Sequence, residues 1–132
     1  MHHDKAKLKD VLKGKCDWVM LDVPCSGSGV MRRNPDLRWK FNLERLHEVA
    51  KVQELILQES LHFLKADTGK IVYCTCSVLF EENLMQVMKF CERNGFEIEN
   101  GGHFTTLPRH RGMDGFFSAT LVPAGRKKKG IA

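Results

Sequence analysis

Two short apolar runs, separated by a long segment of helical periodicity, constrain the fold of this chain more than any other feature. The first run covers residues 18–21 and the second covers residues 71–75. Between them, apolar residues recur at helical spacing from about residue 43 to residue 66. A strand, a helix and a second strand in this order form a right-handed crossover, so the two strands are predicted to be parallel neighbours.

Further elements extend this unit into an α/β domain. The run at 18–21 is apolar on both faces, which is typical of a strand buried in a parallel sheet. Asn94-Gly95 is a helix stop signal. The other predicted elements are a loop at 25–42, a turn at 67–69, a helix at 81–93, and strands at 96–99 and 115–122. We therefore predict an α/β fold with a mostly parallel sheet and flanking helices.

Length and composition favour one globular domain. The chain has 132 residues, of which 42% are hydrophobic and 28% are charged. No apolar run approaches the roughly 20 residues of a membrane helix, and the N-terminus lacks a signal-peptide core. We expect a cytosolic or nuclear protein with a lead-in segment at 1–16, a folded domain at 17–122 and a basic flexible tail at 123–132.

Charge and cysteine content exclude several classes of function. Four positive charges of the net +5 lie in the run Arg126–Lys129, so the body of the chain is only weakly basic. The five cysteines are odd in number and irregularly spaced, which argues against a disulfide framework. Cys74 and Cys76 lack the spacing of a zinc knuckle, so we expect no metal site and reduced thiols.

Two cysteine motifs follow the two predicted parallel strands. Asp22-Val23-Pro24-Cys25 ends the first strand and Thr75-Cys76-Ser77 ends the second. Ligands of α/β sheets bind beyond the carboxyl ends of the strands, so both motifs should face one cleft. A cysteine near a helix start can have a lowered pKa and act as a nucleophile. The alternatives are a small core residue for Cys76 and a flexible loop for Ser26–Gly29.

Together these motifs resemble the Sun-type family of RNA (cytosine-5) methyltransferases, which includes bacterial ribosomal RNA enzymes and the nucleolar antigen enzymes of eukaryotes. The matching stretches are residues 21–40, Gln53, residues 69–87, Asp114 to Phe117, and Ala119. The resemblance implies a Rossmann-like fold dependent on S-adenosylmethionine, of which this chain would be the C-terminal portion. DNA (cytosine-5) methyltransferases lack the second cysteine, so the presence of both cysteines favours RNA.

The resemblance also implies residue roles. Cys76 would be the nucleophile that adds to carbon 6 of cytosine, and Asp22 would bond the edge of the base. Cys25 would help to remove the carbon 5 proton and to release the product. Asp22 and Pro24 would contact the methyl donor, S-adenosylmethionine. Thr75 and Ser77 would position the motif.

A basic segment after the first motif is expected to bind RNA phosphates. Its members are Arg32, Arg33, Arg38 and Lys40. The interleaved Trp39 and Phe41 are expected to pack, and Phe116 and Phe117 to lie in the core. The expected partner is RNA, with ribosomal RNA favoured over transfer RNA, and no membrane. The expected location is the cytoplasm, or the nucleolus in a eukaryote.

The chain departs from the family in lacking a glycine-rich loop and an acidic residue for the methyl donor. Two interpretations remain open. The chain is a piece of a longer methyltransferase, or it is a natural short protein that lost activity and serves as an RNA-binding or assembly module. Either way, we expect that the chain alone does not methylate and binds the donor weakly or not at all.

Two further expectations concern self-association and an alternative chemistry. An uncovered edge at residues 18–22 is a candidate for self-pairing, so we expect dimers or poor solubility.

A third class of function is a cysteine hydrolase in which Cys76 works with a histidine. The available histidines are His47, His62, His103 and His110.

Overall fold

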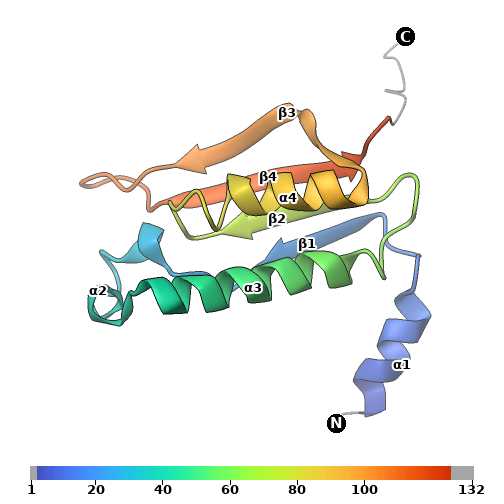
Figure 1. Ribbon diagram of the computed structural model, residues 1–132, viewed down its shortest axis with the longest axis horizontal. Helices are drawn as coiled ribbons and strands as arrows, with labels where there is room; N and C mark the ends of the chain where they lie inside the picture. The colour runs from blue at the N-terminus through green and yellow to red at the C-terminus, as the bar shows by residue number, and fades with distance from the viewer. Residues whose placement is uncertain (1–2, 126–132) are drawn as a thin grey trace.

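The computed structural model describes residues 3–125, which form four strands with helices between them (Figure 1). In chain order the elements are α1 (His3–Leu12), β1 (Trp18–Asp22), the 3-10 turn η1 (Ser28–Val30), α2 (Leu37–Lys40), α3 (Leu43–Ser60), β2 (Lys70–Thr75), α4 (Leu84–Asn94), β3 (Phe96–Thr106) and β4 (Phe116–Pro123). The predicted order of strands and long helices is confirmed. No helix within residues 3–125 is long and apolar enough to cross a membrane.

The four strands form one mixed sheet in the order β1-β2-β4-β3. β1 and β2 are parallel, which confirms the predicted crossover through α3. β4 is antiparallel to both β2 and β3, so the prediction of a mostly parallel sheet is wrong for the described residues. The reason is that β3 and β4 follow each other without a helical crossover, and the chain therefore reverses direction between them.

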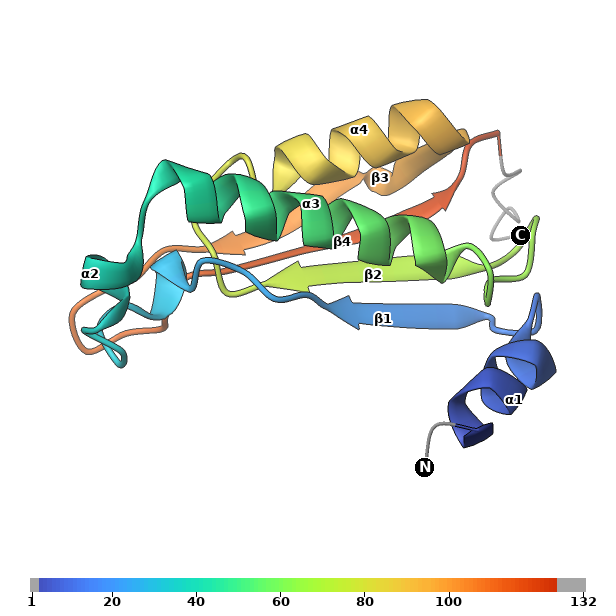
Figure 2. The ribbon, with the colours of Figure 1, turned by 60° about the horizontal axis from the view of Figure 1, so that its bottom comes forward.

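Both long helices lie on the same face of the sheet (Figure 2). The core between the layers contains Leu57 of α3, Val87 of α4 and the inward side chains of β2 and β4. The other face of β1 is open: Trp18 is 57% exposed and Met20 is 71% exposed. The prediction that this strand is buried on both faces is therefore wrong, because helices cover only the face that carries Val19 and Leu21.

Two helix ends can be compared with their predicted positions. α3 ends at Ser60 rather than near residue 66, because the next turn pairs with the N-terminal segment. There the Cys16 N–H donates to the Phe63 carbonyl at 2.8 Å, and the Lys65 N–H donates to the Cys16 carbonyl at 2.9 Å. α4 ends at Asn94, and Gly95 has a positive φ of 67°, so the predicted helix stop is confirmed.

The segments expected to be irregular contain some regular structure. The predicted loop at 25–42 includes η1 and α2, and α1 lies within the predicted lead-in segment. β3 is longer than predicted and carries a register shift between Ile98 and His103. β4 continues to Pro123, the first residue of the predicted tail, whereas the basic run at 126–129 lies outside the described residues.

Candidate active site

The two cysteine motifs meet at the carboxyl ends of β1 and β2. Cys25 lies in the loop after β1, and Cys76 follows β2 directly. The parallel pairing of Asp22 with Cys74 continues in a hydrogen bond of 3.1 Å from the Val23 N–H to the Cys74 carbonyl. The loops therefore leave the sheet side by side, and the Sγ atoms of Cys25 and Cys76 are 3.0 Å apart.

Burial sets the protonation state of one member of this pair. Desolvation, followed by the hydrogen bond with Cys76, raises the pKa of the Cys25 thiol to about 12. Cys25 is therefore a neutral thiol at physiological pH, and its S–H can donate to the Cys76 sulfur. Both thiols are half-buried, and the neutral Cys25 thiol lies directly beside the Cys76 sulfur.

Further hydrogen bonds join the loop after β1 to the loop after β2. Ser28 Oγ accepts from the Val78 N–H at 3.0 Å and lies 3.0 Å from Ser77 Oγ. The Gly29 N–H donates to the Cys76 carbonyl at 3.0 Å. These bonds order the Ser-Gly-Ser-Gly segment, which composition alone presents as a flexible linker.

Glu82 is a fully buried carboxylate at the junction of the two loops, and it was not predicted as a site residue. Its Oε1 accepts from the Ser26 N–H at 2.7 Å and its Oε2 accepts from Ser26 Oγ at 2.6 Å. Ser77 Oγ also donates to Oε2, and Gln53 Nε2 donates to Oε1 at 3.2 Å. An acidic residue just before a helix is ordinarily exposed, so the sequence carries no signal of this burial.

Asp22 and Pro24, the residues predicted to touch the methyl donor, are both exposed at the end of β1. The Pro24 carbonyl accepts from Gln53 Nε2 at 2.9 Å, which fixes the start of the loop against α3. Pro24 also lines an open hollow together with the first turns of α3. A donor with a nucleoside group needs a glycine-rich loop and an acidic residue, so these two residues fit only one edge of such a site.

Arg32 and Arg33 are engaged within the protein. The guanidinium of Arg32 donates to Asp114 Oδ1 at 2.8 Å and to the Arg109 carbonyl at 2.8 Å. Arg33 Nε is 2.7 Å from Asp114 Oδ2. Asp114 is buried while both arginines are largely exposed, so the pair neutralises a buried carboxylate and ties the β3–β4 loop to the loop after β1.

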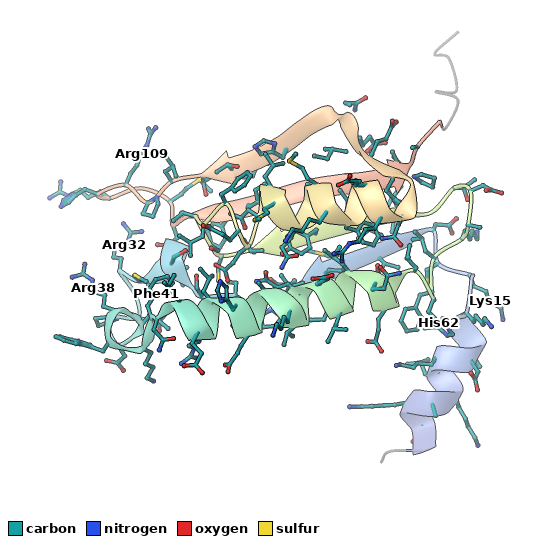
Figure 3. All side chains as sticks on the ribbon, viewed as in Figure 1. Lys15, Arg32, Arg38, Phe41, His62 and Arg109 are labelled. Atoms are coloured by element: carbon teal, nitrogen blue, oxygen red, sulfur yellow. The ribbon has the colours of Figure 1, made fainter. Side chains whose placement is uncertain are left out.

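Arg38 and Lys40 remain exposed on α2 at the same end of the molecule. Figure 3 shows Arg38, Arg32 and Arg109 at that end, far from Lys15 and His62. Trp39 lies between the two cations and is 91% exposed, so the prediction that it packs is wrong. The short α2 has no buried residue, which leaves the indole without a packing partner from its own helix.

Two glycines bring the β3–β4 loop against the site. The Gly115 N–H donates to the Gly29 carbonyl at 2.8 Å. A Cβ atom on Gly29 would lie 2.1 Å from the Gly115 carbonyl oxygen, so no larger residue fits there. Phe117 beyond this contact is buried as predicted, whereas Phe116 is 39% exposed and does not belong to the core.

The histidines are placed elsewhere. The His62 ring contacts Phe63 with centroids 5.1 Å apart, and the His103 ring contacts Phe117 with centroids 5.4 Å apart. No histidine within residues 4–125 is hydrogen-bonded to Cys25 or Cys76. The geometry therefore offers no support for a cysteine hydrolase, which needs a histidine beside the thiol.

Comparison with known proteins identifies the family. The family described as 16S rRNA methyltransferase RsmB/F matches residues 1–122. The chain belongs to the RsmB/F family. This finding confirms the resemblance to Sun-type methyltransferases that the two cysteine motifs indicated.

Curated relatives of this RsmB/F chain are much longer than the chain itself. The ribosomal RNA small subunit methyltransferase B of Citrobacter koseri is 40% identical over 116 residues, which cover 82% of this chain and 26% of that protein. The protein of the same name from Vibrio vulnificus is 40% identical over 112 residues, covering 80% and 26%. The chain thus spans about a quarter of the length of these relatives.

Two solved structures match most of this chain. The crystal structure of PH0851 matches with 28% identity and a TM-score of 0.75, covering 83% of this chain and 27% of that one. NSun6 from Pyrococcus horikoshii with SFG matches with 28% identity and a TM-score of 0.64, covering 78% and 29%. These matches confirm the predicted Rossmann-like methyltransferase fold class.

Proposed function

We propose that this chain supplies the base-acting residues of an S-adenosylmethionine-dependent RNA (cytosine-5) methyltransferase. The observation that carries the proposal is the 3.0 Å separation of the Cys25 and Cys76 sulfurs at the carboxyl ends of two parallel strands. Membership of the RsmB/F family supports it, as does the similarity to NSun6 with SFG, an S-adenosylmethionine analogue.

Cys76 acts as the nucleophile in this proposal. Its thiolate forms a bond to carbon 6 of cytosine, and the electron pair of the carbon 5–carbon 6 double bond moves toward carbon 5. S-adenosylmethionine, when bound, supplies the methyl group that carbon 5 takes up. Loss of the carbon 5 proton then restores the double bond and expels the Cys76 sulfur as a thiolate.

Cys25 serves the release step. Burial is the main cause of its raised pKa, but the hydrogen bond and the charge interaction with Cys76 raise that pKa further. Both of these contributions weaken once the Cys76 sulfur is bonded to carbon 6, because a thioether carries no charge. Cys25 therefore loses its proton more readily at the stage that requires a base at carbon 5.

Asp22 and Pro24 complete the proposed contacts at the end of β1. The exposed Asp22 carboxylate accepts a hydrogen bond from the exocyclic amine of the cytosine and thereby orients the ring for addition of the Cys76 sulfur. Pro24 forms one edge of the site for S-adenosylmethionine. The rest of that site must come from outside this chain, so the isolated chain is proposed to be inactive.

RNA is the proposed partner, and ribosomal RNA is favoured over transfer RNA by the names of the curated relatives. Arg38 and Lys40 are the proposed phosphate contacts, and the exposed Trp39 is available for stacking on an unpaired base. Arg32 and Arg33 contribute positive charge to the same end while they hold Asp114. The target cytosine must be unpaired or flipped to reach the thiols.

The test uses the full-length methyltransferase that contains this chain, with RNA that carries 5-azacytidine. We expect a covalent protein–RNA adduct that disappears in the Cys76→Ala variant. The Cys25→Ala variant should accumulate adducts on ordinary RNA, because release is slowed. Loss of the adduct in Cys25→Ala but not in Cys76→Ala would reverse the two roles.

The same experiment separates the proposal from a non-catalytic RNA-binding or assembly module. Such a module would bind RNA but form no adduct with either the unchanged protein or the Cys25→Ala variant. Retention of RNA binding without any adduct would therefore overturn the catalytic assignment in favour of the binding module.

A further inference from the structure

The Glu82 carboxylate connects the two cysteine loops through the residue that follows each cysteine. Ser26 comes directly after Cys25, and Ser77 comes directly after Cys76. Both serine hydroxyls donate to the same oxygen, Oε2 of Glu82. A single buried group therefore serves as a common reference for the positions of both sulfurs.

Hydrogen bonds alone hold this carboxylate in place. Its side chain is 0% exposed, and no lysine, arginine or histidine within residues 3–125 forms an ion pair with it. The four donors are Ser26 N–H, Ser26 Oγ, Ser77 Oγ and Gln53 Nε2. A buried carboxylate without such donors is strongly unfavourable, so the group stays buried only while both loops keep their places.

The backbone around Glu82 is fixed by the core. Tyr73, fully buried in β2, donates its hydroxyl to the Glu82 carbonyl at 2.5 Å. The next residue, Asn83, donates to the Ser77 carbonyl at 2.8 Å and accepts from Thr75 Oγ1 at 2.5 Å. The carboxylate therefore projects from a turn before α4 that hydrogen bonds hold in place. A side chain on such a turn can fix the distance between the two cysteine loops.

We infer that Glu82 is a positioning residue that sets the separation and relative orientation of the Cys25 and Cys76 thiols. The inference rests on the proposed function for its catalytic meaning, because nucleophile and release group must reach one cytosine ring. The thiol geometry itself can be measured without RNA or methyl donor. Failure of this inference is therefore distinguishable from failure of the proposed function.

Two substitutions separate hydrogen bonding from packing. Glu82→Gln keeps the shape of the side chain and one carbonyl oxygen that accepts from the Ser26 N–H. Its amide NH₂ group can donate hydrogen bonds to the two serine hydroxyls. Glu82→Leu fills a similar volume but can form none of the four bonds. If Glu82 only fills volume, both variants should have the same thiol geometry. If Glu82 positions the thiols, Glu82→Gln should keep that geometry and Glu82→Leu should lose it.

The experiment measures disulfide formation between Cys25 and Cys76 in this chain, with Cys16, Cys74 and Cys91 changed to Ser. Diamide removes two electrons and two protons from the thiol pair, and the rate reports how often the sulfurs meet. We expect Glu82→Leu to slow the reaction about tenfold or more, because small displacements of reacting groups have effects of this size. Glu82→Gln should stay within about threefold of the unchanged rate.

Val87→Ala is the matched control, because Val87 is a fully buried residue of the adjacent helix that packs in the core. It should lower the melting temperature while leaving the oxidation rate within about twofold, since the apolar Val87 side chain forms none of the hydrogen bonds to the Glu82 carboxylate. If Glu82→Leu does not fold, Ser77→Ala removes one arm of the network and should slow the reaction in the same direction. Unchanged rates in both variants, or equal slowing in Val87→Ala, would overturn the inference.

Discussion

The carboxyl ends of β1 and β2 bury polar side chains, whereas the open face of β1 exposes large apolar ones. At the carboxyl ends, the polar groups of Ser26, Ser77 and Glu82 are withdrawn from solvent and hydrogen-bonded to one another. Along the open face of β1, the large apolar side chains of Trp18 and Met20 lie in solvent. Burial in this protein therefore follows the site and the helix-covered face, and it does not follow hydrophobicity alone.

The two regions also differ in how many tertiary contacts hold them. The carboxyl ends of β1 and β2 with the loops that follow them, called the site end below, are held by hydrogen bonds between segments about fifty residues apart in sequence. The pair formed by Ser28 and Ser77 is one example. Among the described residues, no buried side-chain nitrogen or oxygen lacks a partner. On the open face of β1, the Trp18 ring contacts the Lys70 ammonium and Met20 is 71% exposed. Changes at Met20 should therefore alter association more than folding.

The largest expected effect concerns the reactivity of Cys25. A pKa raised from 9.0 to about 12 leaves about a thousandfold less thiolate at pH 8 than an ordinary cysteine has. Alkylation of Cys25 by iodoacetamide, followed by mass spectrometry, should therefore be slow and should rise with pH until about pH 12. The same residue in urea should react as an ordinary cysteine.

The Cys76→Ala variant sharpens this prediction. It removes the hydrogen bond and the charge interaction that raise the Cys25 pKa, but it leaves the desolvation. Alkylation of Cys25 should become faster than in the unchanged protein and remain slower than in urea. A rate in the folded protein equal to the rate in urea would show that the site end does not withdraw this thiol from solvent.

The next largest effect is expected at the contact between Gly29 and Gly115. Glycine-to-alanine substitution at residue 29 places a methyl group 2.1 Å from a backbone oxygen, which has no rotamer to change. The free energy of unfolding should fall by about 3 kcal/mol, as for severe overpacking, in a chemical denaturation experiment.

Gly102→Ala is the matched control for this substitution. A Cβ atom there meets nothing within 4 Å, and the backbone is not in the left-handed region. The change should stay within about 0.5 kcal/mol. Equal destabilisation by both substitutions would mean that the site end is no more tightly packed than an exposed strand.

The smallest effect on stability is expected on the open face of β1. We propose that a second copy of the chain pairs with this edge, because β1 is the edge strand and exposes Trp18 and Met20. Changing Met20 to Lys should favour the monomer in light scattering while altering the free energy of unfolding by less than about 0.5 kcal/mol. Trp18 is left in place, because the Lys70 ammonium lies 4.9 Å from the centroid of its ring. Val11→Lys, an exposed apolar position on α1, should leave association unchanged. A clean monomer of the unchanged chain would contradict the pairing.

Much of the fold could be predicted from local pattern. The helical period of residues 43–60 and the apolar runs at β1 and β2 were sufficient to predict a parallel crossover, which the register confirms. The stop at Gly95 was also predictable, because a glycine after a periodic segment indicates a left-handed helix cap. The antiparallel pairing of β4 was not predictable, since periodicity does not specify which strand a segment joins.

Local pattern was enough to show that Cys25 and Cys76 follow consecutive strands of one crossover, and hence that they lie at the same end of the sheet. The burial of Glu82 between their loops and the ion pairs of Arg32 and Arg33 with Asp114 became known only from the folded chain. The physical reason is the range of the interactions. A strand or helix is encoded by neighbouring residues, whereas the burial of a charge depends on donors that arrive from distant segments when the chain folds.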